Sequence, residues 1–518
     1  MRTWVRRDPL VCAPREEWVT HVSEAESKEQ PPRRIATGSA GLDTLLNGGW
    51  LHGGTYMVSG APGTGKTLLG NQLCFSHVAQ GGRAVFVTML SESHGRMMTH
   101  LRRMDFFQRE HIGQSLHYVS GYATLKAEGL EGLSRLLYRS VREHQATVLV
   151  VDGLLAAQEM AGSVLVFREF LHALGVHNAL AGCTTLVLTN RPESAADPQF
   201  AMVDGVVALE MHLEGQHAVR TVEVTKLRGE RQLTGRHVFE IQQSGLVVYP
   251  RLESLYGQPP EEPPEPPGRA GFGLAGLDAM LGGGLPHGSF TLLTGATGSG
   301  KTLLGLHLLA AGAAHDEPGL YVSFTESRAR LLAKAAGAGL ALDDALANGR
   351  LEFERYSAVE PLPDALAHRM LAHVRRQGTR RLVIDGLGPV LDTMTPPRAL
   401  GFVSALSHAL RARGTTLVLT HPTSLLLAQQ HEPPLHGVEP LIDNLVMLRY
   451  VDRGAQMYRL LSILKMRESD YESSLREFSI SAGGIRVARD GTSAEAVLRG
   501  EPPRAQKRRA TRARRKRS

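Results

Sequence analysis

The sequence predicts an α/β protein made of two consecutive copies of one domain, each a mostly parallel sheet flanked by helices. Three observations lead to this prediction. At 518 residues, the chain is long enough for two ordinary domains and additional tails. A long stretch of the first half recurs in the second half. Within both halves, short apolar segments alternate with longer amphipathic segments, which is typical of alternating strands and helices.

The internal repeat is the clearest of the three observations. ATGSAGLDTLLNGGWLHGGTYMVSGAPGTGKTLLG begins at Ala36, and FGLAGLDAMLGGGLPHGSFTLLTGATGSGKTLLG begins at Phe272. The agreement continues downstream, where TVLVVDGLL from Thr147 corresponds to RLVIDGLGP from Arg381. The separation between the copies, from Ala36 to Phe272, is far longer than the period of a solenoid repeat. We therefore infer that a whole domain has been duplicated.

The predicted strands of the first copy are continuous apolar runs: TYMVSG, AVFVTM, TVLVVD and TTLVLT. Runs without strict polar alternation are typical of parallel strands that helices cover on both faces. In such sheets, ligands bind beyond the carboxyl ends of the strands. The motifs described below lie at these ends.

A proline-rich segment, YGQPPEEPPEPPGRAG, separates the two copies. Proline at this density favours an extended, semi-rigid spacer. The predicted organisation is a polar, disordered N-terminal extension (1–33), the first copy of the domain (34–256), a linker (257–270), the second copy (271–490) and a basic disordered tail (491–518).

The composition, with 42% apolar and 21% charged residues, is that of an ordinary globular protein. The three cysteines are too far apart in sequence for a disulfide framework or a clustered metal site, which favours a cytoplasmic location. No signal or membrane segment is visible, so we expect no membrane contact. The net charge of +7 arises from residues 501–518, where nine Lys or Arg accompany one Glu. Because this segment carries +8, the rest of the chain carries about −1.

Two segments match the pattern G-x-x-x-x-G-K-[ST], and each lies between a predicted strand and a predicted helix. The glycines allow backbone N–H groups to converge on phosphate oxygens, and the lysine reaches the β- and γ-phosphates. A chance glycine-rich turn is the alternative, but two matches in register with the repeat argue against it. The predicted cofactors are ATP and Mg²⁺, and the predicted ATP-binding residues are Gly60, Gly63, Thr64, Gly65, Lys66, Thr67, Leu68, Gly295, Gly298, Ser299, Gly300, Lys301, Thr302 and Leu303.

Asp152 and Asp385 each end an apolar strand downstream of the phosphate loops. A carboxylate at this position can hold Mg²⁺ or its water, together with the hydroxyl of Thr67 or Thr302. A strand-ending aspartate can also be only a turn residue or helix cap. The position relative to the loop in both copies favours the metal role.

Glu92 and Glu326 follow the second strand of each copy, in the segments SES and TES. A carboxylate beside the γ-phosphate can orient and deprotonate the attacking water. Because such segments also begin helices well, a capping role is the alternative.

Two Lys-x-Arg pairs, Lys226 with Arg228 and Lys465 with Arg467, lie on late strands of the two copies. Alternate residues of a strand point the same way, so each pair presents two cations on one face. These cations are either solvated surface charges or groups that complete the ATP site of a neighbouring subunit.

Over residues 35–490, the tandem phosphate loops, the E-S segments, the Asp-ending strands and the K-L-R-G and K-M-R segments resemble the KaiC family of the RecA/DnaB superfamily. The resemblance implies two tandem RecA-like P-loop NTPase domains, ATPase activity and a hexameric double ring with ATP between subunits. It further implies that the Lys-Arg pairs act in trans, that the role is regulatory with a protein partner, and that serine/threonine autokinase activity is a hypothesis to test.

Three positions depart from the family pattern. Ser91 and Thr325 stand where the clock proteins carry the first of two adjacent glutamates. Glu439 and Pro440 align with the usual pair of phosphate acceptors, and neither side chain can accept phosphate. Glu468 replaces the glycine that usually follows the second Lys-Arg motif. A clock-type phosphorylation cycle at the usual position is therefore in doubt.

Two other functions remain open from the sequence. A RecA/DnaB-like DNA-associated ATPase would use the basic tail to neutralise phosphates, although the body is near neutral and the tail lacks aromatic residues for base stacking. The second open function is that of a scaffold in which one ring is inactive. Both copies, however, keep the phosphate loop, the strand-ending aspartate and the glutamate.

Overall fold

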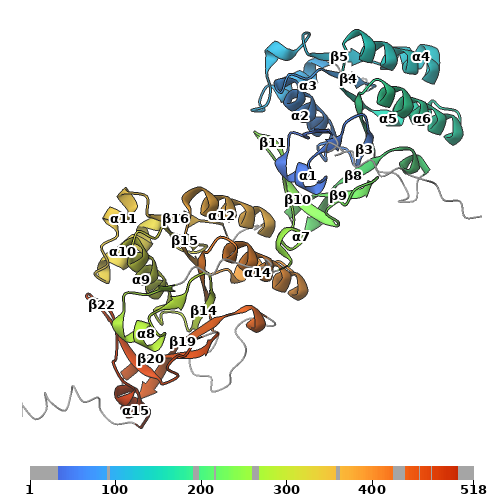
Figure 1. Cartoon of the computed structure of the whole chain (residues 1–518). Coiled ribbons are helices and arrows are strands. Elements are labelled where there is room, and N and C mark those ends of the chain that lie inside the picture. Colours follow the sequence, from blue (N-terminus) through green and yellow to red (C-terminus); the bar gives the residue numbers. More distant parts are fainter. Residues whose placement is uncertain are drawn as a thin grey trace, which may run out of the picture.

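The computed structural model describes residues 33–89, 94–190, 198–214, 217–258, 268–357, 362–423, 438–453, 456–467 and 469–499. Two nine-stranded sheets, one in each half of the chain, carry helices on both faces (Figure 1). This arrangement confirms the predicted fold class of two mostly parallel sheets flanked by helices.

In the first half, the central parallel strands are joined at one edge by an antiparallel extension. The strand order is β11-β10-β9-β8-β3-β7-β6-β4-β5, in which β8 to β11 pair antiparallel. The elements are β1 (Arg34–Ile35), α1 (Ala40–Leu45), β2 (Trp50–Leu51), β3 (Thr55–Gly60), α2 (Lys66–Ala79), β4 (Ala84–Thr88), α3 (His94–Leu101), β5 (Leu116–Ser120), α4 (Tyr122–Glu143), β6 (Val148–Asp152), α5 (Leu154–Glu159), α6 (Val164–Leu180), β7 (Thr184–Thr189), β8 (Gly205–Glu214), β9 (His217–Leu227), β10 (Arg236–Gln242), β11 (Gly245–Tyr249) and α7 (Leu252–Tyr256).

The second half repeats this order of elements, with one additional helix, α11, before β16. Its sheet runs β16-β15-β17-β18-β14-β19-β20-β21-β22, with the antiparallel strands again at one edge. The elements are β12 (Arg269–Ala270), α8 (Ala275–Met280), β13 (Leu285–Pro286), β14 (Phe290–Gly295), α9 (Lys301–Ala313), β15 (Gly319–Ser323), α10 (Arg328–Gly337), α11 (Asp343–Ala347), β16 (Leu351–Arg355), α12 (Pro363–Gln377), β17 (Arg381–Asp385), α13 (Gly388–Leu391), α14 (Pro396–Arg411), β18 (Thr416–Pro422), β19 (Asn444–Arg453), β20 (Gln456–Met466), β21 (Arg476–Ser481), β22 (Gly484–Val487) and α15 (Thr492–Arg499).

Each sheet is buried on both faces, as the continuous apolar strands require. In the first half, α1 and α2 pack on one face, and α4, α5 and α6 pack on the other. In the second half, α8, α9 and α10 cover one face, and α12, α13 and α14 cover the other. The predicted strands TYMVSG and TTLVLT correspond to β3 and β7, which are buried along their whole length. This double burial explains why these strands show no polar alternation.

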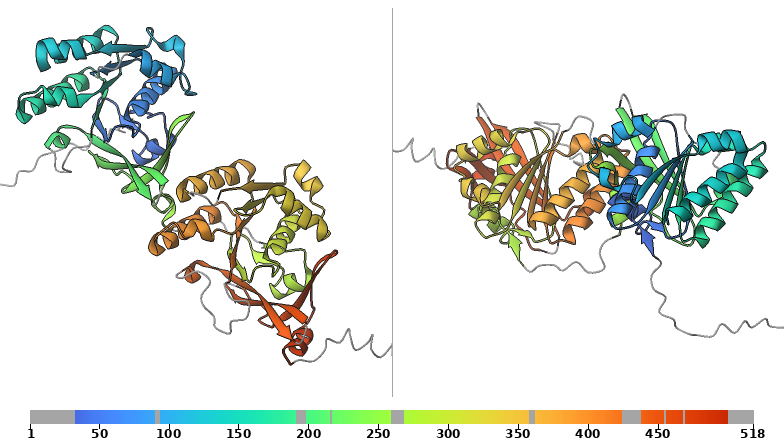
Figure 2. Two further views of the ribbon diagram at one scale, coloured as in Figure 1. Left: turned by 180° about the vertical axis from the view of Figure 1, so that it is seen from behind. Right: turned by 90° about the horizontal axis from the view of Figure 1, so that it is seen from above.

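The end of the first half packs into the second half, as both views in Figure 2 show. Helix α7 follows the last strand of the first sheet, yet its Leu252 belongs to the apolar core that α12 and α14 form on the second sheet. The Tyr256 carbonyl contacts Nδ1 of His408 at 3.0 Å, and His368 Nε2 lies 2.7 Å from the Pro250 carbonyl. These contacts join the two halves through both side chains and backbone.

The buried carboxylate of Asp364 on α12 is central to this contact. It accepts hydrogen bonds from the Leu252 backbone N–H at 3.1 Å and from Arg398 Nη2 at 2.7 Å. Burial raises the pKa of Asp364 to about 6, although the Arg398 charge and the Leu252 N–H act in the opposite direction. The carboxylate therefore carries a desolvation cost that its two partners only partly offset.

We expect this junction to lose stability as the pH rises from 4 to 6. The folded pKa of Asp364 lies above the reference value of 3.8, so the folded chain binds this proton more tightly than the unfolded chain does. The contribution, about 3 kcal/mol, is present below pH 4 and is lost as the pH rises through 6. Denaturant unfolding at several pH values compares wild type with Asp364→Asn, in which this part of the pH dependence should disappear. An identical pH profile in both proteins would contradict the prediction.

Candidate functional site

Both phosphate loops lie at the carboxyl end of a central strand and lead directly into a helix. The first loop joins β3 to α2, and β3 lies between β7 and β8 in the sheet. Gly63 (φ 82°) and Gly65 (φ 105°) adopt left-handed backbone conformations, and Gly298 (φ 81°) and Gly300 (φ 114°) repeat them in the second loop. Residues with a Cβ are strained in this region, so the glycines of the motif are required by the turn itself. The loops thus have the local geometry that phosphate binding needs.

The motif lysines lie against their own loops. Lys66 Nζ donates to the carbonyl oxygens of Gly60 at 2.7 Å and Ala61 at 3.0 Å. Lys301 Nζ makes the equivalent bonds to Gly295 at 2.6 Å and to the next carbonyl at 2.9 Å. Burial lowers the pKa of both lysines, while Asp152 or Asp385 acts to raise it. Each ammonium group is therefore held beside the loop, where it can bind a phosphate oxygen.

The predicted hydroxyl–carboxylate pairs come together in both halves. Thr67 Oγ1 donates to Asp152 Oδ2 at 2.7 Å, and Thr302 Oγ1 donates to Asp385 Oδ2 at 3.0 Å. Burial raises the pKa of Asp152, which the Thr67 hydrogen bond and the Lys66 charge partly counteract. Because hydroxyl and carboxylate oxygens are the ligands that Mg²⁺ prefers, each pair fits this ion and can hold it beside the phosphates.

Two residues of the second site were missed by the sequence motifs. Tyr321 on β15 donates its hydroxyl to Asp385 Oδ2 at 2.6 Å, and the Thr420 hydroxyl donates to the other oxygen, Oδ1. Burial, together with the charge of Asp385, raises the pKa of Tyr321 well above its usual value. The corresponding residue of the first half, Phe86 on β4, has no hydroxyl. Comparing the two repeats position by position is the one sequence signal that could have identified Tyr321.

Of the two predicted catalytic glutamates, Glu326 lies in the described part of the chain and Glu92 does not. Glu92 lies in residues 90–93, outside the described part of the chain. Glu326 follows β15, and its backbone N–H donates to Ser323 Oγ at 3.0 Å. One carboxylate oxygen contacts Lys334 Nζ, and the other is buried without a hydrogen-bond partner among the described residues. The cap of helix α10 is the next residue, Ser327, whose side chain accepts from the Arg330 N–H. The carboxylate of Glu326 is therefore not used to begin this helix.

The Lys-Arg pairs lie far from the phosphate loop of their own half. Lys226 Nζ donates to the carbonyls of Phe200 and Val203, both at 2.7 Å. Arg228 Nη2 donates to the Ala201 carbonyl at 2.7 Å. In the second half, Arg467 Nη2 donates to the Pro440 carbonyl at 2.6 Å, and Lys465 lies two residues earlier on β20. The structure does not bring these cations together with the loops of the same subunit.

Outside these sites, two acidic residues lie beside a histidine. Glu352 and Glu354 on β16 face His373 on α12, whose ring nitrogens lie 3.0 and 3.4 Å from the two carboxylates. Arg376 contacts His373 Nδ1 at 3.1 Å, and Gln377 donates to Glu352 at 2.5 Å. With Arg376 and Gln377 also in contact, this cluster is best described as a polar contact between strand and helix.

The duplicated fold and its two loops with paired hydroxyl and carboxylate groups define a P-loop ATPase of the RecA-like type. The sequence profile of the KaiC ATPase family matches this chain twice, over residues 35–253 and 271–492. The chain therefore belongs to the KaiC ATPase family.

Curated relatives extend over nearly the whole chain. The circadian clock oscillator protein KaiC of Rippkaea orientalis is 26% identical over 494 residues, covering 93% of this chain and 94% of the relative. The protein of the same name from Nostoc sp. is 27% identical, with coverages of 93% and 95%. KaiC 1 of Synechocystis sp. is also 27% identical, with coverages of 91% and 92%. In the described part of the chain, no helix combines the length and apolar character needed to cross a membrane.

Proposed function

We propose that this KaiC-family ATPase assembles into a hexameric double ring, hydrolyses ATP at inter-subunit sites and uses its nucleotide state to regulate a protein partner. The observation that carries the assembly is the position of the Lys-Arg pairs, which lie at the opposite end of the sheet from the loop of the same half. The circadian clock proteins among the relatives support the regulatory role.

The pairing of the strands explains why the Lys-Arg pair is distant from the phosphate loop of its own half. In the sheet, Gly60 at the loop lies beside Leu209, whereas Tyr56 near the start of β3 lies beside Gly205. Gly205 pairs in turn with Leu227, which stands between Lys226 and Arg228. Four residues of strand correspond to about 13 Å, in addition to the separation across β8 and β9. The second half has the same register, with Asn444 beside Thr291 and opposite Met466.

A cation at the amino-terminal end of the sheet cannot reach the γ-phosphate at the carboxyl end of the same sheet. In a ring with head-to-tail contacts, however, this end of one subunit can face the loop of the next. The Lys-Arg pair would then stabilise the charge that develops on the transferred phosphoryl group. The distance within one subunit therefore favours action in trans.

Within each site, the residues have distinct roles in this proposal. The loop N–H groups and Lys66 or Lys301 bind and orient the β- and γ-phosphates. Thr67 with Asp152, and Thr302 with Asp385, would hold Mg²⁺, which neutralises phosphate charge when bound. Glu92 and Glu326 would orient the attacking water and accept its proton. The proposed ATP-binding segments end with Leu68 and Leu303. Each leucine directly follows the motif threonine in the first turn of α2 or α9.

We expect ATP to convert the chain into hexamers with shared sites. Native mass measurement with and without ATP reports the assembly, and a persistent monomer in ATP would overturn it. Mixing then tests the trans arrangement: one chain carries Lys66→Ala and Lys301→Ala, and the other carries Arg228→Ala and Arg467→Ala. Each is expected to be inactive alone, because every site lacks one essential group.

In mixed rings, about a quarter of the sites would combine an intact loop with an intact arginine from the neighbour, so activity should return. If the arginines acted in cis, no mixed site would be complete and activity would stay absent. Mixing each variant with itself, after the same dissociation and reassembly, is the matched control.

For the autokinase hypothesis, the described structure offers no acceptor at the usual position. Glu439 and Pro440 begin a short 3₁₀ helix, Glu439–Leu441, just before β19. We therefore propose hydrolysis without phosphorylation at these two residues. The cytoplasmic location, the domain boundaries given above and any contact of residues 501–518 with nucleic acid stay predictions, and no observation favours the DNA-associated alternative.

A further inference from the structure

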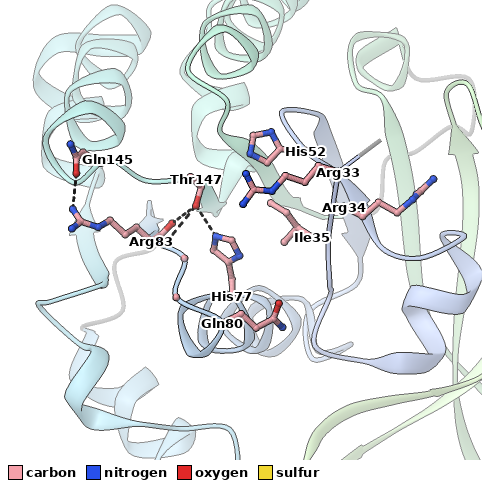
Figure 3. Close-up of a pocket in the computed structure, with 11 residues that line it drawn as sticks. Arg33, Arg34, Ile35, His52, His77, Gln80, Arg83, Gln145 and Thr147 are labelled. Carbon is pink, nitrogen blue, oxygen red and sulfur yellow. Dashed lines mark hydrogen bonds between the residues drawn. The ribbon is translucent and has the colours of Figure 1, made fainter. Parts of the chain in front are cut away.

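A pocket of about 380 Å³ opens in the first half, away from the nucleotide site (Figure 3). Its lining includes His77 and Gln80, at the carboxyl end of α2, whereas the phosphate loop lies at the amino end of the same helix. A helix of 14 residues is about 20 Å long, so the pocket and the loop are separate. Its volume lies within the range of small-molecule sites.

The lining of this pocket is cationic and contains no acidic residue. It includes three arginines and two histidines: Arg33, Arg34, Arg83, His52 and His77. The Arg34 guanidinium has a counter-ion in Glu230. The Arg83 guanidinium extends toward the neutral Gln145 and donates to its Oε1 at 3.0 Å, with no carboxylate partner among the described residues (Figure 3). The Arg33 side chain is exposed and forms no hydrogen bond or ion pair with the residues that the structure describes, whereas the Arg33 carbonyl accepts from the His52 N–H at 2.9 Å.

Burial and the positive charge of the lining lower the pKa of both histidines. Burial lowers the pKa of His52 and of His77, and the charge of Arg33 lowers both further. His77 Nε2 lies 2.7 Å from Thr147 Oγ1, which orients the imidazole at the pocket wall (Figure 3). The lowered pKa values favour the neutral form of both imidazoles, so the positive charge of the lining comes from its arginines.

The second half supplies a carboxylate at the equivalent place. Glu317, just before β15, contacts Arg381 Nε and lies 3.7 Å from His287 Nε2. Arg381 is only 3% exposed and also donates to the carbonyls of Gly271 and Leu308, at 2.6 and 2.8 Å. The second half thus fills this region with its own side chains and neutralises them internally.

Aligning the two repeats shows what has changed. Gly82 stands in the first half where Glu317 stands in the second, and Arg33 stands where Gly268 does. Val148 replaces Arg381, and His77 replaces Gly312, so that the His77 imidazole lies where a side chain at position 82 would begin. The first half therefore lacks the internal carboxylate of the second half and carries an additional cation at the pocket rim.

We propose that this pocket binds a small oxyanion, the phosphate or carboxylate group of a metabolite, beside the His77 imidazole, in the part of the fold where the second half has the Glu317 carboxylate. The guanidinium groups of Arg33 and Arg83 can each donate paired hydrogen bonds to such a group. This site does not depend on the proposed ATPase mechanism, since no residue of the pocket belongs to a phosphate loop.

Titration calorimetry of the full chain tests the proposal, with inorganic phosphate and succinate as probes. The chain carries Lys66→Ala and Lys301→Ala, so that the phosphate loops do not compete. We expect saturable binding of at least one probe at about 0.15 M salt. Arg33→Gly, which installs the residue of the second half, and Arg83→Ala should each weaken it about tenfold. The tighter probe assigns the ligand class.

Arg139→Ala is the matched control, because Arg139 is an exposed arginine of α4 outside the pocket, and it should leave binding unchanged. Circular dichroism confirms that each variant is folded. Absence of saturable binding of both probes would overturn the proposal. Binding that survives both Arg33→Gly and Arg83→Ala would also overturn it, because the anion would then be held elsewhere.

Discussion

Replacing Lys66 and Lys301 together by alanine is expected to abolish ATP hydrolysis. Both ammonium groups are already positioned beside their loops by hydrogen bonds to loop carbonyls, at 2.6 to 3.0 Å. Loss of one such electrostatic group from a transition state typically costs a factor of about 10² to 10³ in rate. Because each half has its own lysine, each single variant should keep the activity of the other half. Phosphate release measures the rate.

Lys126→Ala, at an exposed position of α4, is the control and should hydrolyse ATP at the wild-type rate. Full activity of the double variant would contradict the assignment of both loops. Equal losses in the two single variants would argue against a scaffold half without catalysis. If the ATP carries a labelled γ-phosphate, the wild-type reaction also tests the autokinase hypothesis. Phosphate release without label on the protein would contradict that hypothesis, whereas label on the protein would show an acceptor other than Glu439 and Pro440.

The local parts of the site are predictable from sequence because short-range geometry fixes them. The motif spacing requires glycines at positions such as Gly65 and Gly300, and both indeed have positive φ angles. The approach of Asp152 to Thr67 is also predictable, since the parallel strands of one sheet all end at the same edge. Their separation of 2.7 Å agrees with this expectation.

The long-range parts are not predictable in this way. Nothing in the local pattern of Tyr321 shows that its hydroxyl reaches Asp385, because the two residues are joined only by the pairing of β15 with β17. The packing of Leu252 into the core of the second half likewise depends on how two complete domains meet. Such contacts follow from tertiary structure, whereas periodicity and motif spacing describe only neighbouring residues along the chain.

Substitution of Glu326 is the second change for which we expect a large loss of ATP hydrolysis. The structure argues against the main alternative role of this side chain, which is to cap helix α10. Ser327 caps α10, so a role of Glu326 in beginning that helix does not explain the carboxylate. One of its oxygens is buried without a hydrogen-bond partner in the described residues, which is costly unless the group has another use. Contact with the attacking water would supply that use.

We therefore expect Glu326→Gln, in the Lys66→Ala background, to lower the rate of the second site by about 10² to 10⁴ while ATP still binds. Glutamine keeps the shape of the side chain but cannot accept the proton. Fluorescent-nucleotide binding and phosphate release, measured on the same protein, separate the two steps. Glu495→Gln, on the exposed face of α15, is the matched control. An unchanged rate would contradict a catalytic role, and loss of binding together with rate would indicate that Glu326 instead maintains the structure of the site.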